Sequence, residues 1–125
     1  MIALDASALL AYLYGEPGSQ VVAASLEHSC MSTVNLCEVL SRFTRDGHDG
    51  LLVLTRLLSS PIEFVGFGEA DAAETAALLP TTRIHGLSLG DRACLALASV
   101  RGVPVLTADQ AWLELALDLD IRIIR

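Results

Sequence analysis

The chain has 125 residues, 53% of them hydrophobic, which suits one domain with a proper hydrophobic core and excludes an intrinsically disordered chain. The chain has 15 acidic residues, eight arginines and no lysine. The resulting net charge of −7 argues against a broad basic surface that binds nucleic acid. The three cysteines form no C-x-x-C pair, so neither a disulfide framework nor a zinc knuckle is indicated.

Short apolar segments with strand character alternate with helical patterns along the chain. The predicted strands are residues 2–4, 29–31, 62–65, 103–107 and 121–124. The predicted helices are residues 6–13, 19–28, 33–46, 50–59, 69–79, 88–101 and 109–117, while PTTRIHG at 80–86 is typical of a loop. This alternation predicts an α/β fold in which a mostly parallel central sheet carries helices on both faces, as a single domain over residues 1–125.

Targeting and membrane signals are not evident. No uncharged apolar stretch is long enough to span a bilayer, and the opening residues MIALDASALL reach an acid at Asp5 without a basic flank or a cleavage signature. We therefore expect an untargeted, soluble, cytoplasmic protein with no membrane partner.

Four acidic residues fall where a parallel sheet would place its functional site, beyond the carboxyl ends of the strands. Asp5 follows the first predicted strand, and Asp109 follows the fourth. Asp91 opens the helix that precedes that fourth strand, and Glu38 lies about one turn into the helix after the second strand. The sequence thus predicts that four carboxylates converge on one edge of the sheet.

Each acid also has a purely structural interpretation. Asp5 and Asp109 could cap the helices that follow them, and Asp91 fits a capping box, S-x-x-D. Glu38 could project from the outer face of its helix and pair with Arg42 at i+4, a contact worth only about 0.3 to 0.5 kcal/mol. Taken singly, each acid fits a structural role better than a catalytic one.

The joint placement of these acids favours a metal site. Two carboxylates about 5 Å apart repel by roughly 3 kcal/mol at an effective dielectric near 20, and a divalent cation removes that penalty. Oxygen ligands without matched histidines or cysteines suit Mg²⁺ or Mn²⁺. Phosphodiester hydrolysis is the chemistry that uses such a site, because the metal activates water and stabilises the leaving oxygen.

Four stretches resemble the acidic motifs of PIN-domain ribonucleases: MIALDASALL with Asp5, STVNLCEVL with Glu38, LSLGDRACLALA with Asp91 and PVLTADQAW with Asp109. The length and motif order are similar to VapC-type toxins of bacterial and archaeal toxin-antitoxin pairs. The resemblance covers essentially the whole chain. It implies a PIN-like three-layer sandwich and a Mg²⁺- or Mn²⁺-dependent endoribonuclease, with the four acids as catalytic residues and as ligands of one or two metal ions.

The resemblance also implies supporting residues and partners. Ser7 and Thr107 occupy positions where the family often places a hydroxyl, and we expect each to orient a carboxylate or a metal-bound water. Asn35 is a further candidate, whose alternative role is hydrogen bonding at a helix N-terminus. The implied partners are an RNA substrate such as tRNA or rRNA, a small protein antitoxin that covers the active-site groove, and a second copy in a homodimer.

Other interpretations depend on the basic residues. Arg83, His85 and Arg92 lie near Asp91 in sequence and could bind phosphate, although solvated surface charge explains each of them. A receiver or haloacid-dehalogenase-like phosphatase would need a lysine near the phosphoryl group, and the chain has none.

The remaining alternative is a catalytically silent module that keeps the PIN fold and the antitoxin groove. The four intact acids speak against it.

Overall fold

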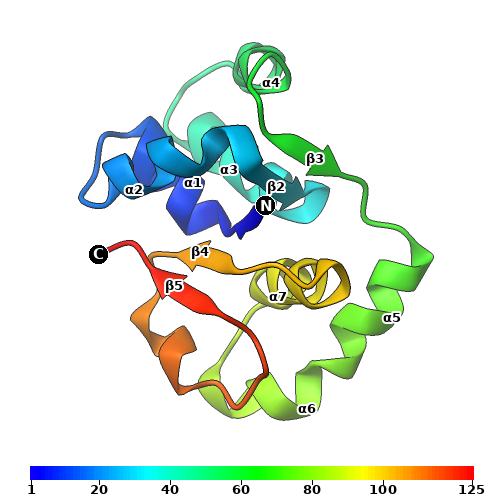
Figure 1. Cartoon of the computed structure of the whole chain (residues 1–125). Helices are drawn as coiled ribbons and strands as arrows, with labels where there is room; N and C mark the ends of the chain where they lie inside the picture. The colour runs from blue at the N-terminus through cyan, green and yellow to red at the C-terminus, as the bar shows by residue number, and fades with distance from the viewer.

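The computed structural model describes all 125 residues and contains one sheet of five parallel strands in the order β3-β2-β1-β4-β5 (Figure 1). The strands are β1 (Ile2–Leu4), β2 (Ser29–Ser32), β3 (Glu63–Val65), β4 (Val105–Thr107) and β5 (Ile121–Ile123). All five predicted strands are present. The fourth begins two residues later than predicted, after Pro104, which has no N–H for a strand ladder.

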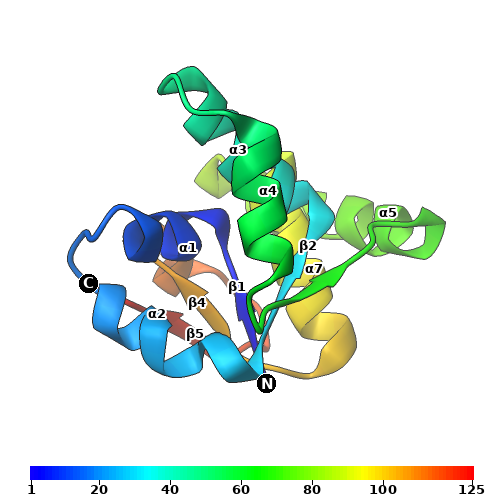
Figure 2. The same cartoon turned by 90° about the horizontal axis from the view of Figure 1, so that it is seen from above.

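Helices cover both faces of this sheet. They are α1 (Ala6–Leu13), α2 (Ser19–Ser25), α3 (Thr33–Arg45), α4 (Gly50–Leu58), α5 (Glu69–Ala77), α6 (Leu79–Thr82) and α7 (Leu89–Arg101), with short 3-10 helices η1 (Leu26–His28), η2 (Arg83–His85) and η3 (Gln110–Glu114). Figure 2 shows α3 and α4 side by side as a hairpin that projects from the body of the molecule. The predicted three-layer α/β architecture is confirmed.

Two segments differ from the sequence prediction. The stretch 80–86, predicted as a loop, is largely helical, because Pro80 lies in the first turn of α6, where its missing N–H costs nothing. The stretch 109–117, predicted as a helix, forms only the 3-10 turns of η3 before the backbone becomes extended at Leu115. Its buried side chains, Trp112 and Leu115, are three residues apart, a spacing that a 3-10 turn places on one side.

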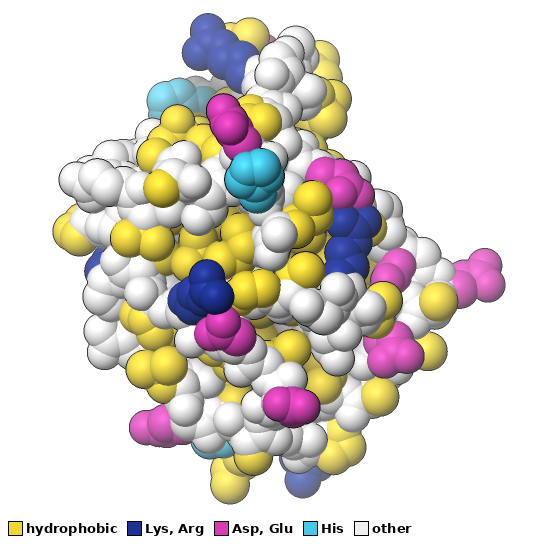
Figure 3. Space-filling view, viewed as in Figure 1, with side chains coloured by type: hydrophobic (Ala, Val, Ile, Leu, Met, Phe, Trp, Pro, Cys, Tyr) yellow, Lys and Arg dark blue, Asp and Glu magenta, His cyan; other side chains and the backbone are white.

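Charged side chains of both signs are scattered over the face turned to the viewer in Figure 3, either singly or in neighbouring pairs. This face has no broad basic area. Among the helices, none combines the length and the apolar character needed to cross a membrane.

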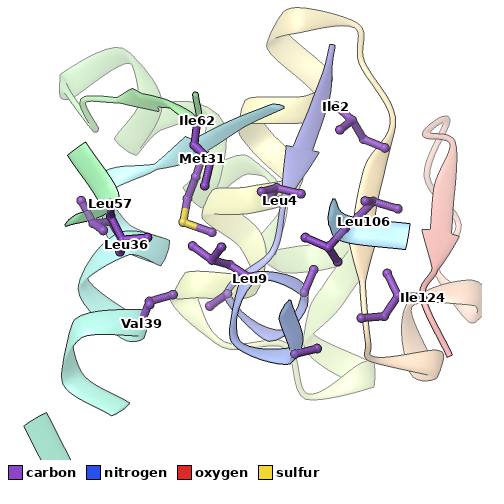
Figure 4. Close-up of a cluster of buried hydrophobic side chains, with 14 residues drawn as sticks. Ile2, Leu4, Leu9, Met31, Leu36, Val39, Leu57, Ile62, Leu106 and Ile124 are labelled. Carbon is purple, nitrogen blue, oxygen red and sulfur yellow. The ribbon is translucent and has the colours of Figure 1, made fainter. Parts of the chain in front are cut away.

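Alternate residues of the central strands place their side chains in two separate hydrophobic cores, because successive side chains of a strand point to opposite faces of the sheet. Leu4 packs with α1 to α4 on one face, whereas Ala3 packs against α7 and η3 on the other. Figure 4 shows Leu4, Leu9 and Met31 meeting in the middle of the first cluster. Both cores pack against the central strands, and the ends of these strands position the site.

Candidate active site

The order of the strands reverses between β1 and β4, and this switch point is where open α/β sheets bind their ligands. The register pairs Leu4 with Leu106, and the backbone N–H of Asp5 donates to the carbonyl of Leu106 at 3.0 Å. Asp5 and Thr107, at the ends of these two strands, therefore lie side by side.

The side chain of Asp5 does not cap the helix that follows it, so the capping interpretation is wrong for this residue. Its Oδ2 instead accepts hydrogen bonds from Ser7 Oγ at 2.5 Å and from Thr107 Oγ1 at 3.0 Å. Ser7 Oγ accepts from the backbone N–H of Ala108 at 2.9 Å, and Thr107 Oγ1 accepts from that of Asp109 at 3.1 Å. The backbone after β4 thus fixes both hydroxyls, and the hydroxyls orient the carboxylate.

Three of the predicted acids share one electrostatic neighbourhood. Asp5 is only 4% exposed, and burial raises its pKa to about 6 despite the two hydroxyl donors that lower it. The negative charges of Asp91 and Glu38 raise the pKa of Asp5 further. Burial also raises the pKa of Glu38, and Asp91 adds to that effect. The ionised form of this group of acids is therefore costly without a cation.

Asn35 connects Glu38 to the beginning of α7. Its Nδ2 donates to Glu38 Oε2 at 3.0 Å and to the carbonyl of Gly90 at 2.9 Å, and the residue is fully buried. The Oδ1 atom of Asn35 is buried without a hydrogen-bond partner, a feature that typically costs about 1 to 3 kcal/mol. The Asn35 amide therefore links Glu38 to Gly90 while one of its own polar atoms stays unpaired, at a cost to stability.

The alternative interpretation of Glu38 as an exposed partner of Arg42 is wrong. Arg42 Nε bonds Asp46 Oδ2 at 3.0 Å and lies over the ring of Tyr14, with its guanidinium carbon 5.0 Å from the ring centroid. Glu38 is half-buried and faces the first turn of α7.

The capping interpretation is confirmed for the other two acids. Ser88 and Asp91 form a reciprocal capping box: the N–H of Asp91 donates to Ser88 Oγ at 3.2 Å, and the N–H of Ser88 donates to Asp91 Oδ2 at 2.9 Å. Asp109 Oδ1 accepts from the N–H of Ala111 at 3.0 Å. Asp109 is exposed and lies at the rim, just past the end of β4.

Local hydrogen bonds occupy only one oxygen of each of the four carboxylates. Protein hydrogen bonds go to only one oxygen of each acid: Oδ2 of Asp5, Oε2 of Glu38, Oδ2 of Asp91 and Oδ1 of Asp109. The second oxygen of each acid has no hydrogen bond within the protein. Local structural use and metal ligation are therefore compatible for all four.

The acids do not form a closed coordination shell. Nowhere in the structure do three or more histidine, cysteine or acidic side chains lie close enough to hold one metal ion directly. A hydrated Mg²⁺ or Mn²⁺ still fits, because such ions keep several waters and need only one or two carboxylates besides substrate phosphate. The all-oxygen donor set and the charge cost at Asp5 also suit a hard cation.

The basic residues near Asp91 differ in their surroundings. Arg83 is exposed and forms no ion pair, which agrees with solvated surface charge. Arg92 is half-buried: its Nη1 donates to the carbonyl of Thr75 at 3.1 Å, and its Nε is buried without a partner. The surface interpretation is therefore wrong for Arg92, which packs against α5.

Gly90 is a member of the site that the sequence does not predict. Its carbonyl accepts the Asn35 amide, and its backbone lies against the Glu38 carboxylate. One signal was available, because glycine is a poor helix former and stands here in the first turn of a predicted helix.

Comparison with known proteins gives the family. A family model described as PIN domain matches residues 2–117, a stretch that includes all four acids. The chain belongs to the PIN domain family. Among curated proteins, no sequence matches this PIN domain.

Solved structures share the fold of this PIN domain at low sequence identity. A chain of a toxin-antitoxin complex from Klebsiella pneumoniae is 17% identical, with a TM-score of 0.75 and coverage of 100% of this chain and 98% of that one. A DNA-bound VapBC from Salmonella typhimurium is 15% identical, with a TM-score of 0.77 and coverage of 99% and 98%. A Mycobacterium tuberculosis VapC described as a sarcin-ricin loop cleaving toxin is 16% identical, with a TM-score of 0.74 and coverage of 88% and 91%.

Proposed function

We propose that this PIN domain is a Mg²⁺- or Mn²⁺-dependent endoribonuclease and the toxin of a toxin-antitoxin pair. The observation that carries the proposal is the group of Asp5, Glu38 and Asp91 beside the switch point of the sheet, where burial opposes ionisation of Asp5. PIN-domain nucleases generally use a divalent metal, and one of the structural neighbours is described as a sarcin-ricin loop cleaving toxin.

In this proposal, Asp5, Glu38, Asp91 and Asp109 hold one or two hydrated metal ions, each directly by one or two carboxylates and otherwise through bound water. The oxygens that local hydrogen bonds leave free are the ones that would face the ions. When bound, the metal supplies an activated water and stabilises the leaving oxygen of the phosphodiester. Ser7 and Thr107 fix the rotamer of Asp5 through its Oδ2. Asp91 lies in the first turn of α7, where the positive end of the helix dipole lowers the cost of bringing negative charge together.

A chain of negative net charge repels a negatively charged RNA, so binding of RNA requires a cation. Its net charge is −7, so general attraction does not hold RNA, and the bound cation must offset the charge of both the carboxylates and the phosphate. We expect a structured tRNA or rRNA as substrate, because RNA of this kind is recognised by shape and by splayed single-stranded bases.

The resemblance implies an antitoxin over the active-site groove, and we extend its contact to the projecting hairpin, because α3 carries both Glu38 and residues of that hairpin. A groove of about 230 Å³ lies there, lined by Leu13, Phe43, Val53, Arg56 and Leu57. The helix α4 also leaves leucines exposed, among them Leu51 at 72% and Leu58 at 62%, and exposed apolar area of this kind is typical of a protein partner site. Two of the structural neighbours are described as a toxin-antitoxin complex and a VapBC. We also propose that this PIN domain forms a homodimer, as the resemblance implies.

The test is cleavage of a mixed tRNA and rRNA pool by purified protein with Mg²⁺ or Mn²⁺. EDTA and the Asp91→Asn variant should each abolish cleavage. The matched control is Asp118→Asn, which removes an exposed carboxylate without a hydrogen bond and should cleave normally. If the wild type is as inert as Asp91→Asn and calorimetry detects no Mn²⁺ binding, the protein is a silent binding module and the proposal fails.

A further inference from the structure

We propose that Gly90 is a positioning residue for the reaction: its missing side chain makes the space in which the Glu38 carboxylate lies against α7. The glycine sets the position of one metal-site carboxylate, and the consequence of that position for the reaction rests on the proposed nuclease function. The geometry itself can be tested without any metal.

The space at Gly90 is occupied by the carboxylate itself. A Cβ built at Gly90 would lie 2.0 Å from Glu38 Oε1, 2.4 Å from its Cδ and 2.6 Å from its Oε2. Each separation is well inside van der Waals contact, so no residue with a Cβ can stand here while Glu38 keeps its place. The carboxylate is the flexible end of a long side chain, and it would therefore move before the helix does.

The backbone at this position does not itself require glycine. Five glycines of the chain have positive φ, and Gly90 is not among them. Gly90 is the second residue of α7, where alanine would stabilise the helix more than glycine does. The remaining reason for glycine is the approach of Glu38.

Asn35 holds the carboxylate against this glycine. One buried amide nitrogen donates both to Glu38 Oε2 and to the carbonyl of Gly90, so the two acceptors are fixed relative to one another. A Cβ at Gly90 would push Glu38 away from α7 and break its bond with Asn35. The carboxylate would also leave the neighbourhood of Asp91, whose charge now acts on it.

A metal-free measurement tests the geometry. The side-chain amide signal of Asn35 in a ¹⁵N–¹H spectrum reports its bond to Glu38. In Gly90→Ala this signal should shift to the position that it has in Glu38→Ala. The matched control is Gly66→Ala, which adds the same methyl group at a glycine of ordinary φ with no atom within 4 Å, and there the Asn35 signal should stay as in the wild type. An unchanged Asn35 signal in Gly90→Ala would overturn the inference.

Mn²⁺ calorimetry and melting curves on the same variants test the consequence. Gly90→Ala should bind Mn²⁺ about 10- to 100-fold more weakly, as loss of a ligand-orienting contact typically does, without a lower melting temperature. In the Glu38→Ala background, Gly90→Ala should cause no further loss, because the clash has no partner. A lower melting temperature with wild-type Mn²⁺ affinity would mean that Gly90 serves only packing. If the wild type binds no Mn²⁺ while the Asn35 signal still shifts, the proposed function fails and the positioning geometry stands.

Discussion

Replacing Asp5 with asparagine should stabilise the metal-free protein at neutral pH. Burial raises the pKa of Asp5 from its ordinary 3.8 to about 6 in the fold. Below pH 3.8 both the folded and the unfolded chain hold this proton, so Asp5 costs nothing. As the pH rises toward 6, the unfolded chain loses the proton first and stability falls. At about 1.4 kcal/mol per pH unit, the full cost above pH 6 is about 3 kcal/mol.

Urea unfolding in EDTA measures this cost, with fluorescence of the single tryptophan, the buried Trp112, as the signal. The free energy of unfolding of Asp5→Asn should exceed that of the wild type by about 3 kcal/mol at pH 8, and the difference should vanish below about pH 3. The hydroxyls of Ser7 and Thr107 can still donate to the asparagine carbonyl, so the comparison isolates the charge. Asp118→Asn, which removes an exposed carboxylate without a hydrogen bond, is the matched control and should unfold like the wild type. A gain that does not change with pH, or a loss at pH 8, would refute the desolvated state of Asp5.

The remaining predictions concern the supports of Asp5, the metal and the core. Thr107→Val removes one of the two donors to Asp5, so the pKa of Asp5 should rise further and calorimetry at pH 7 should show about 10- to 100-fold weaker Mn²⁺ binding. Mn²⁺ at 100 times its Kd should raise the free energy of unfolding of the wild type by about 2.7 kcal/mol but leave Asp5→Asn unchanged, as thermal melts with and without Mn²⁺ would show. Leu9→Ala, at a fully buried position, should cost about 2.7 to 5 kcal/mol in urea unfolding without altering Mn²⁺ affinity, and an altered affinity would mean that the core also shapes the site.

The sequence predicts the strands and most helices well, because apolar periodicity and turn residues are local signals. It does not distinguish the functions of Asp5 and Asp109, since each follows a strand and precedes a helix. The difference between them depends on sheet register: Thr107 donates to Asp5 across 102 positions of sequence, whereas Asp109 accepts from a residue only two positions away.

The contact of Glu38 with α7 is likewise invisible in the sequence. A helical pattern places Arg42 one turn from Glu38 and so suggests an ion pair. The structure instead brings Gly90 to Glu38 through an Asn35 bond that spans 55 positions. The sequence therefore predicts which acids to examine, and long-range packing determines what holds each one.

The most direct test of the account is the chemistry of the RNA ends that the purified protein produces with Mn²⁺. Attack of an activated water on the phosphodiester, with loss of the 3′ oxygen, leaves a 5′-phosphate and a 3′-hydroxyl. We expect these ends from the wild type, and no cleavage in EDTA or with Asp91→Asn. Products with 2′,3′-cyclic phosphate ends that persist in EDTA would show that the RNA 2′-hydroxyl is the nucleophile, and would contradict a carboxylate-held metal as the centre of the reaction.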